Sequence, residues 1–148
     1  MSLLLSKKSE YAIQSLLYLT LTKEGVAVTA GEIAEHLQIP KEFVSKILQE
    51  LTMSGFIKSK KGKGGGFLLG KSPKEIFLLD VVKAIEGNDV LEGCVLGFPG
   101  CSDEYPCAVH SSWAKLLAET KKMLSSRNLH QLAHKTVVKF DAIRKKLI

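Results

Sequence analysis

Residues 29–55 read TAGEIAEHLQIPKEFVSKILQELTMSG and predict two short helices separated by a tight turn. Thr29 followed three residues later by Glu32 is a capping-box pattern, in which each side chain accepts a hydrogen bond from the other residue's backbone N–H. This pattern predicts a helix over 30–37. Pro40 cannot continue that helix, because it has no N–H to donate, but it suits the first position of a second helix.

The second helix is predicted over 41–53, and Gly55 is placed to end it as a C-terminal cap. Helical spacing assigns an apolar face to Phe43, Val44, Ile47, Leu48 and Leu51. The opposite face carries polar side chains that can bind DNA: Lys41, Glu42, Ser45, Lys46 and Gln49. Two such helices are typical of a helix-turn-helix, although the stretch alone also fits any pair of packed amphipathic helices.

A lysine- and glycine-rich segment follows directly. Residues 56–61 and 67–69 predict two strands, with 62–66 as their turn, because glycine tolerates positive φ. Five lysines and no acidic residue lie between Lys58 and Lys71, and so dense a positive patch attracts polyanions; a lysine run alone is as often a solvated loop. The lysines that we expect to contact phosphates or the minor groove are Lys60, Lys61 and Lys63. A helix-turn-helix followed by such a hairpin indicates a winged-helix fold that binds double-stranded DNA.

Residues 65–72, GGFLLGKS, also match the pattern of a phosphate-binding loop. That loop needs a buried strand before it and a helix that opens at its Lys-Ser pair. Here a strand candidate occupies the middle of the pattern, and Pro73 follows directly, so we interpret the match as chance. Because no acid–base constellation and no Cys-x-x-Cys motif is present either, we do not expect an enzyme.

Composition sets the class of protein. Of the 148 residues 45% are hydrophobic, which is enough for a packed core, and the net charge is +6. No apolar run approaches the roughly 20 residues of a membrane helix, and the first residues lack the order of a signal peptide. We therefore expect a cytoplasmic protein with no membrane association.

Further helices are predicted over 6–21, 79–86, 109–125 and 129–147. The helix over 109–125 carries a long apolar stripe, which predicts pairing with its copy in a homodimer, burial within the chain, or both. The stripe consists of Trp113, Leu116, Leu117, Thr120 and Leu124. The predicted fold class is mainly α with a small β wing, a winged helix-turn-helix followed by a long dimerisation helix.

That fold divides the chain into three parts. Residues 1–87 would form the winged-helix DNA-binding domain, with the wing at 56–70. Residues 88–108 would form a cysteine-bearing loop, and 109–148 the dimerisation helix and a C-terminal helix.

All three cysteines, Cys94, Cys101 and Cys107, fall in the loop, and His110 follows three residues later. Three thiols in a cytoplasmic chain argue against structural disulfides. Thiolates are soft ligands that suit iron–sulfur clusters, zinc or copper. Structural zinc sites usually space cysteines two to four residues apart, whereas these gaps are longer. The residues leave an iron–sulfur cluster, a zinc site and unmetallated redox-reactive thiols open, with His110 as a possible nitrogen ligand or a plain helix-start residue.

In this order, the helix-turn-helix, wing and cysteine loop make the chain similar to the Rrf-type family of bacterial winged-helix transcription regulators, the IscR/NsrR/CymR group. The similarity covers nearly the whole chain. It is most specific at Leu5-Ser6-Lys7, Tyr11-Ala12, residues 61–70, Cys94, Cys101, Cys107 and His110.

The resemblance implies a homodimer paired through the helix at 109–125 and an iron–sulfur cluster whose state changes DNA affinity. Cys107 and His110 resemble the end of a ligand set for a 2Fe–2S cluster, which is implied over 4Fe–4S. Glu10 stands where some members place a carboxylate that reaches the partner's cluster, so it is the alternative fourth ligand. Oxygen destroys many exposed clusters, so a crystal could lack this one.

The predicted function is that of a DNA-binding transcription regulator, a repressor more than an activator, whose cluster senses redox state, nitric oxide or cluster supply. One alternative is a cluster-free regulator of the same fold, controlled by a partner protein or by thiol oxidation. An alternative of another class is a zinc- or iron–sulfur-binding redox protein.

Overall fold

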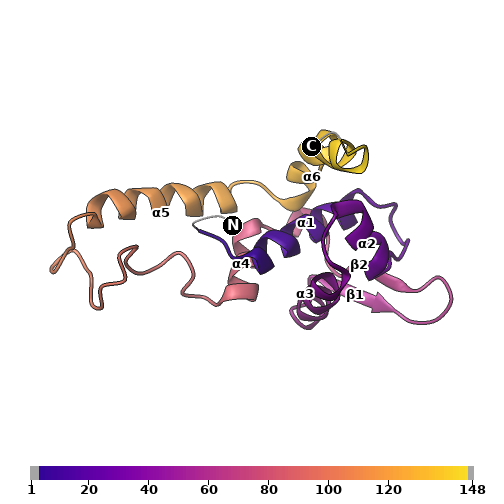
Figure 1. Cartoon of the computed structure of the whole chain (residues 1–148), viewed down its shortest axis with the longest axis horizontal. Coiled ribbons are helices and arrows are strands. Elements are labelled where there is room, and N and C mark those ends of the chain that lie inside the picture. Colours follow the sequence, from indigo (N-terminus) through magenta and orange to yellow (C-terminus); the bar gives the residue numbers. More distant parts are fainter. Residues whose placement is uncertain (1–3, 147–148) are drawn as a thin grey trace.

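The structure is a computed structural model that describes residues 4–146 (Figure 1). Its elements in chain order are α1 (Lys7–Leu21), α2 (Ala30–Leu37), α3 (Lys41–Met53), β1 (Ile57–Lys60), β2 (Gly66–Leu69), a short 3-10 helix (Pro73–Glu75), α4 (Leu78–Glu86), α5 (His110–Ser125) and α6 (Leu129–Arg144). The predicted fold class, mainly helical with a small β wing, is confirmed. Among the described residues no helix is both long and apolar enough to span a membrane.

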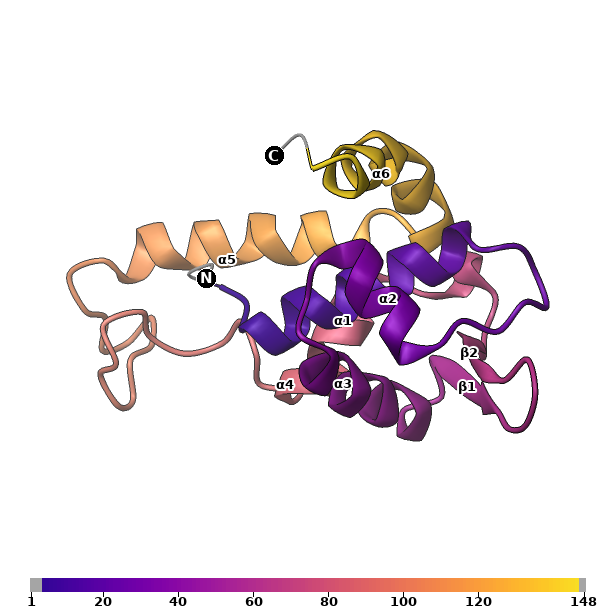
Figure 2. The same ribbon diagram turned by 45° about the vertical axis from the view of Figure 1, so that its right-hand side comes forward.

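Helix α1 lies at the centre of the fold, and α2, α3, α4 and α6 all pack against it (Figure 2). Apolar side chains recur along α1 at helical spacing, and Ala12 and Leu16 are fully buried. Ile33 of α2 and Leu48 and Leu51 of α3 are fully buried in the same core. Burial of these side chains fixes the positions of α2 and α3 on α1.

The helix-turn-helix forms with the predicted bounds for both α2 and α3. The Thr29 hydroxyl accepts a hydrogen bond from the Glu32 N–H at 3.1 Å, and the Glu32 carboxylate accepts one from the Thr29 N–H at 3.3 Å. Gln38 ends α2 in the left-handed conformation, with φ of 56°. Pro40 is the N-cap residue of α3 rather than its first helical residue. These local signals account for the accurate helix bounds.

The wing is an antiparallel hairpin in which Ile57 pairs with Leu69 and Lys60 with Gly66. An additional bridge joins Phe67 of the wing to Val28, the residue before the cap of α2. Gly66 has φ of 143°, and a Cβ there would lie 2.5 Å from the Val28 carbonyl oxygen, so this close approach requires glycine. The wing is therefore attached to the start of the helix-turn-helix.

The second half of the chain leaves the core and returns to it. Residues 87–109 form neither helix nor strand, and α5 projects away from the other helices with this loop at its far end (Figure 1). The Leu129 N–H then donates to the Ile76 carbonyl at 2.8 Å, and α6 packs on α1 and α2. The predicted end of this helix, 147, lies outside the described residues.

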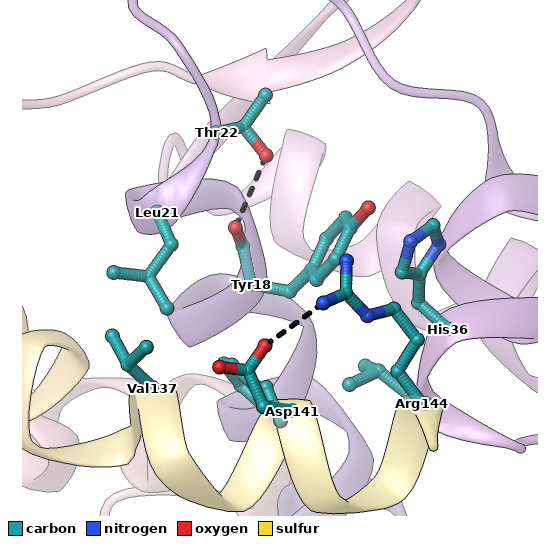
Figure 3. Close-up of a pocket in the computed structure, with 9 residues that line it drawn as sticks. Tyr18, Leu21, Thr22, His36, Val137, Asp141 and Arg144 are labelled. Atoms are coloured by element: carbon teal, nitrogen blue, oxygen red, sulfur yellow. Dashed lines mark hydrogen bonds and ion pairs between the residues drawn. The ribbon is translucent and has the colours of Figure 1, made fainter.

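A surface groove of about 460 Å³ lies where α6 meets α1 and α2 (Figure 3). The Tyr18 ring stands between two other rings there. Its centroid is 5.0 Å from that of His36 on α2 and 6.3 Å from that of Phe140 on α6. These contacts join the C-terminal helix to the helix-turn-helix.

Three sequence predictions are corrected or sharpened by the fold. Phe43 was assigned to the apolar face of α3 but is 57% exposed, with its ring beside that of Tyr11. At 100° per residue it lies at the edge of the apolar stripe rather than within it. Helix α4 begins at Leu78, one residue before the predicted start. Residues 65–72 contain β2 and no opening helix, so the phosphate-loop pattern lacks its required context.

Candidate functional site

Helix α3 turns its predicted polar side chains to the surface. Lys41, Glu42, Lys46 and Gln49 are exposed, and Ser45 is half-buried. Their orientation follows from the buried face of the same helix, which is anchored by Val44, Ile47, Leu48 and Leu51. Amide and ammonium groups displayed on a helix in this way can reach base edges in a major groove. Base contact by these residues remains a prediction.

The wing lysines Lys60, Lys61 and Lys63 are all exposed, and their contact with DNA remains a prediction. Gly62 and Gly64 have φ of 88° and 72°, which brings the chain around a tight turn between them. The lysines are thus carried on a short projecting hairpin beside α3. Such a hairpin can place ammonium groups against phosphates while α3 lies in the groove.

The cysteine loop is shaped by local turns. The Gly97 N–H donates to the Cys94 carbonyl at 3.0 Å, and the His110 N–H donates to the Cys107 carbonyl at 3.1 Å. The sulfur atoms of Cys94, Cys101 and Cys107 converge, and all lie within 4.8 Å of one another. Among the described residues, these three cysteines are the ones close enough together to hold a metal ion. None of the three is in a disulfide.

The pKa values of Cys94 and Cys101 are shifted in opposite directions. A hydrogen bond from the backbone of Phe98, supported by others from Leu96 and the neighbouring thiols, lowers the pKa of Cys94 to about 7 against the effect of burial. A backbone hydrogen bond from Cys107 favours the Cys101 thiolate, but burial and the adjacent sulfurs outweigh it and raise the pKa of Cys101. Three thiolates this close repel one another, so a bound cation would favour their joint deprotonation.

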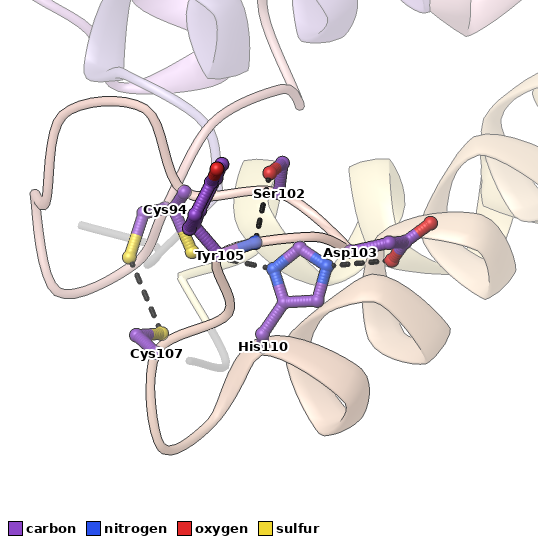
Figure 4. A network of polar contacts seen from close by, with 7 residues as sticks. Cys94, Ser102, Asp103, Tyr105, Cys107 and His110 are labelled. Atoms are coloured by element: carbon purple, nitrogen blue, oxygen red, sulfur yellow. Dashed lines mark hydrogen bonds and ion pairs between the residues drawn. The ribbon is translucent and has the colours of Figure 1, made fainter.

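His110 joins the cysteine group as its nitrogen member (Figure 4). It is the first residue of α5, and its Nδ1 lies 3.3 Å from the Cys101 sulfur. On the other side of the ring, Nε2 lies 2.9 Å from Oδ1 of Asp103. No sequence pattern indicated Asp103, because its contact with His110 depends on how an irregular loop folds.

Two close contacts join the four side chains two by two. The Cys94 and Cys107 sulfurs are 3.6 Å apart, and Cys101 and His110 form the 3.3 Å pair. Two thiolates on one tetrahedral metal, with bonds of about 2.3 Å, would be about 3.8 Å apart, close to the first separation. Soft sulfur donors with one imidazole suit an iron–sulfur cluster or zinc. The residues present therefore fit such a group.

The other predicted site residues lie elsewhere. In this chain the Glu10 carboxylate pairs with the Lys7 ammonium at 3.1 Å, and binding to a partner's cluster remains a prediction. On α5, Thr120 and Leu124 are buried within the chain itself, Leu116 is exposed, and Trp113 and Leu117 are half-buried. Sequence reasoning did not predict that Phe43 is exposed, although its position at the edge of the apolar face could have indicated this.

Sequence comparison identifies relatives over most of the chain. It is 29% identical to the HTH-type transcriptional regulator IscR of Photorhabdus laumondii over 130 residues, 88% of this chain and 79% of that protein. It is 28% identical to IscR of Escherichia coli, again over 88% of this chain and 80% of that one.

Solved structures show the same fold. The global cysteine regulator CymR of B. subtilis matches with a TM-score of 0.74 and 22% identity, covering 89% of this chain and 97% of that chain. T. potens IscR matches with a TM-score of 0.70 and 22% identity, covering 88% and 87% of the two chains. Both chains support the winged-helix architecture.

The Rrf2 family model, described as an iron-dependent transcriptional regulator, matches residues 5–135. Its members are DNA-binding transcriptional regulators and not enzymes, as expected from the absence of a catalytic constellation in the sequence. The match spans the helix-turn-helix, the wing, the cysteine loop and α5. The chain belongs to the Rrf2 family of transcriptional regulators.

Proposed function

We propose that the protein is a homodimeric regulator, a repressor in its principal role, whose affinity for operator DNA is set by an iron–sulfur cluster. The convergence of three thiols and one imidazole at the start of α5 carries this proposal. Cys94, Cys101, Cys107 and His110 would hold the cluster. Their arrangement as two pairs favours 2Fe–2S, which has two metal atoms to share among four ligands.

The DNA-binding side of the proposal uses α3 and the wing. Ser45, Lys46 and Gln49 would face bases, while Lys60, Lys61 and Lys63 would neutralise phosphates. When bound, the cluster supplies a redox-sensitive centre. The chain's own contribution is to hold the loop and the first turn of α5 in one arrangement, which changes operator affinity only if DNA-bound and free dimers differ in that arrangement.

A cluster-free mechanism is the second candidate, because the Cys94 and Cys107 sulfurs lie 3.6 Å apart. An oxidant such as a peroxide or a disulfide would accept two electrons while the two thiols lose their protons and form an S–S bond. In this mechanism the disulfide between Cys94 and Cys107, and not a cluster, would hold the cysteine loop in one arrangement. This candidate predicts regulation without bound iron.

The test is anaerobic reconstitution of the full chain and of Cys107→Ala, followed by iron and sulfide assay and titration of an operator selected from random duplexes. We expect the parent to take up a cluster and Cys107→Ala to lose it. For a coupling of about 1–3 kcal/mol, cluster loss should change operator affinity about 5–150-fold. The matched control is Ser111→Ala, an exposed polar residue in the first turn of α5.

The two candidates give different results. If Cys107→Ala binds as much iron and sulfide as the parent, the cluster proposal is wrong. Operator affinity that follows peroxide treatment in iron-free parent, and not in Cys107→Ala, would identify the disulfide mechanism instead.

A further inference from the structure

Both ring nitrogens of His110 are engaged, and their partners define the state of the ring (Figure 4). Oδ1 of Asp103 lies 2.9 Å from Nε2, and the Cys101 sulfur lies 3.3 Å from Nδ1. An ionised carboxylate can only accept a hydrogen bond, so this contact favours the tautomer of a neutral ring in which Nε2 carries the proton. The lone pair of a neutral ring then belongs to Nδ1, the atom that faces the sulfurs.

We propose that Asp103 is a positioning residue that holds the His110 ring so that Nδ1 binds the metal next to Cys101. This inference rests on the proposed cluster function. Metal-binding histidines commonly donate their second ring N–H to a carboxylate, which fixes the tautomer and the ring orientation. Here the carboxylate comes from the same loop as the cysteines.

The backbone around His110 does not fix the orientation of its ring, so a side-chain contact is needed to do so. The backbone of His110 is fixed, because its N–H donates to the Cys107 carbonyl at 3.1 Å and the residue begins α5. The ring could still rotate about its Cβ–Cγ bond, which would turn a carbon atom toward the sulfurs. The hydrogen bond to Asp103 opposes that rotation.

Asp103 is itself held by a turn. The Ser102 N–H donates to the Tyr105 carbonyl at 3.3 Å, and the Tyr105 N–H donates to the Ser102 hydroxyl at 3.2 Å. These two hydrogen bonds close the segment that carries Asp103. Glu104 lies in the same turn and has the same charge, but the structure records no hydrogen bond or ion pair between its described side chain and His110. A Glu104 variant therefore tests whether an effect comes from the contact with His110 or only from a negative charge in this turn.

The first measurement is the rate at which anaerobically reconstituted protein loses its cluster to a chelator. We expect Asp103→Ala to lose it faster than the parent, by up to about 10–100-fold, since removal of such an outer-shell partner typically lowers metal affinity by that factor. Asp103→Asn should be intermediate, because its amide oxygen still accepts from Nε2–H without the charge. Glu104→Ala should behave as the parent, and an equal effect of Glu104→Ala would overturn the proposal.

The second measurement identifies the bound atom. Protein labelled with ¹⁵N at either Nδ1 or Nε2 of histidine is reduced and examined by pulsed EPR. We expect the strong hyperfine coupling of a directly bound nitrogen from the Nδ1 label, lost in His110→Ala. Strong coupling from Nε2, or a bound cluster without histidine coupling, would overturn the inference while leaving the cluster function intact. A parent protein that binds no cluster would overturn both.

Discussion

The carboxylate of Glu86 caps the start of α1, the helix on which α2, α3, α4 and α6 pack. The Ser6 N–H donates to its Oε1 at 2.8 Å. Burial raises the pKa of Glu86, but hydrogen bonds from Ser6 and Ser9 and the charge of Lys8 together outweigh it and hold the pKa below its usual value. A carboxyl group with a lowered folded-state pKa stabilises the fold above its unfolded pKa, and that stabilisation is lost as the pH falls through the folded pKa.

We therefore expect Glu86→Gln to lower the free energy of unfolding by about 1 kcal/mol at neutral pH, since a charged acceptor is replaced by a neutral one. The difference from the parent should shrink as the pH falls and the parent's carboxyl group is protonated. Urea unfolding across acidic and neutral pH measures this, with exposed Glu92→Gln as the control. A difference that does not change with pH would contradict the capping role.

Single substitutions can also distinguish the proposed base contacts of α3 from the proposed phosphate contacts of the wing. Gln49→Ala should change the preference among operator sequences by about 1–3 kcal/mol, because we propose that its amide on α3 contacts base edges. Lys61→Ala should weaken binding to all duplexes and reduce the slope of log affinity against log salt by about one. Titration of cognate and random duplexes at several salt concentrations distinguishes these effects. Lys139→Ala on α6 is the control, and a Lys61 variant with an unchanged salt slope would remove the wing from the interface.

Residue type and spacing predicted much at this scale. The capping box of Thr29 and Glu32 was readable because it depends on a separation of three residues. The convergence of the cysteines was suggested by their concentration in one loop. The contact of Asp103 with His110 was not predictable, because it depends on turns that no periodicity describes.

At the scale of elements, α5 separates its apolar side chains into two faces. Thr120 and Leu124 are buried within the chain itself. Trp113 donates its indole N–H to the Gly93 carbonyl at 3.2 Å, which ties the helix to the loop. Leu116 and Met123, seven residues apart, are 47% and 63% exposed. A seven-residue repeat of exposed apolar side chains is the pattern of a helix that pairs with another helix.

We accordingly expect Leu116→Glu to disrupt the proposed dimer, since it would place an unpaired charge in the interface at a cost of several kcal/mol. Sedimentation at micromolar concentration should then show a monomer. Lys115→Glu alters charge at an exposed neighbouring position of the same helix and should remain dimeric. A dimeric Leu116→Glu variant would mean that this face of α5 is not the interface.

The sequence predicted the position of α5 but not its division into faces. Periodicity shows that apolar residues share a side of a helix, yet Leu116 and Thr120 fall within one broad stripe. Only the placement of the loop and α4 decides which part of the stripe is covered. The bounds of α2 and α3 were accurate because caps, Pro40 and Gly55 mark them locally.

At the scale of the whole molecule, the cysteine loop and the wing lie at opposite ends (Figure 1). A cluster in the loop is therefore far from DNA bound at this chain's own wing and α3. In the proposed dimer its effect would pass through α5, by changing how two helix-turn-helix units are spaced. Half-sites read by such dimers are about 34–36 Å apart, so a small change in spacing alters affinity.

The packing of α6 on α1 could not be predicted from the sequence. The sequence predicts a dimerisation helix and a C-terminal helix over 109–148, but it does not predict that α6 packs on α1 and α2 through contacts such as that of Tyr18 with Phe140. Local spacing predicts a helix but not the distant partner of its apolar face. Contacts between residues more than a hundred positions apart depend on the whole topology.

The irregular loop at 87–109 has a consequence for the fate of the protein. Its backbone–backbone hydrogen bonds are confined to local turns, and exposed segments of this kind are where proteases cut. We expect subtilisin to cleave cluster-free protein there much faster than cluster-loaded protein, and equal cleavage rates would contradict this. The two fragments should still elute together in gel filtration, because α6 holds the C-terminal piece to α1. In a cell, loss of the cluster would then shorten the lifetime of the regulator, so that its abundance, and not its affinity alone, would follow the supply of iron and sulfide.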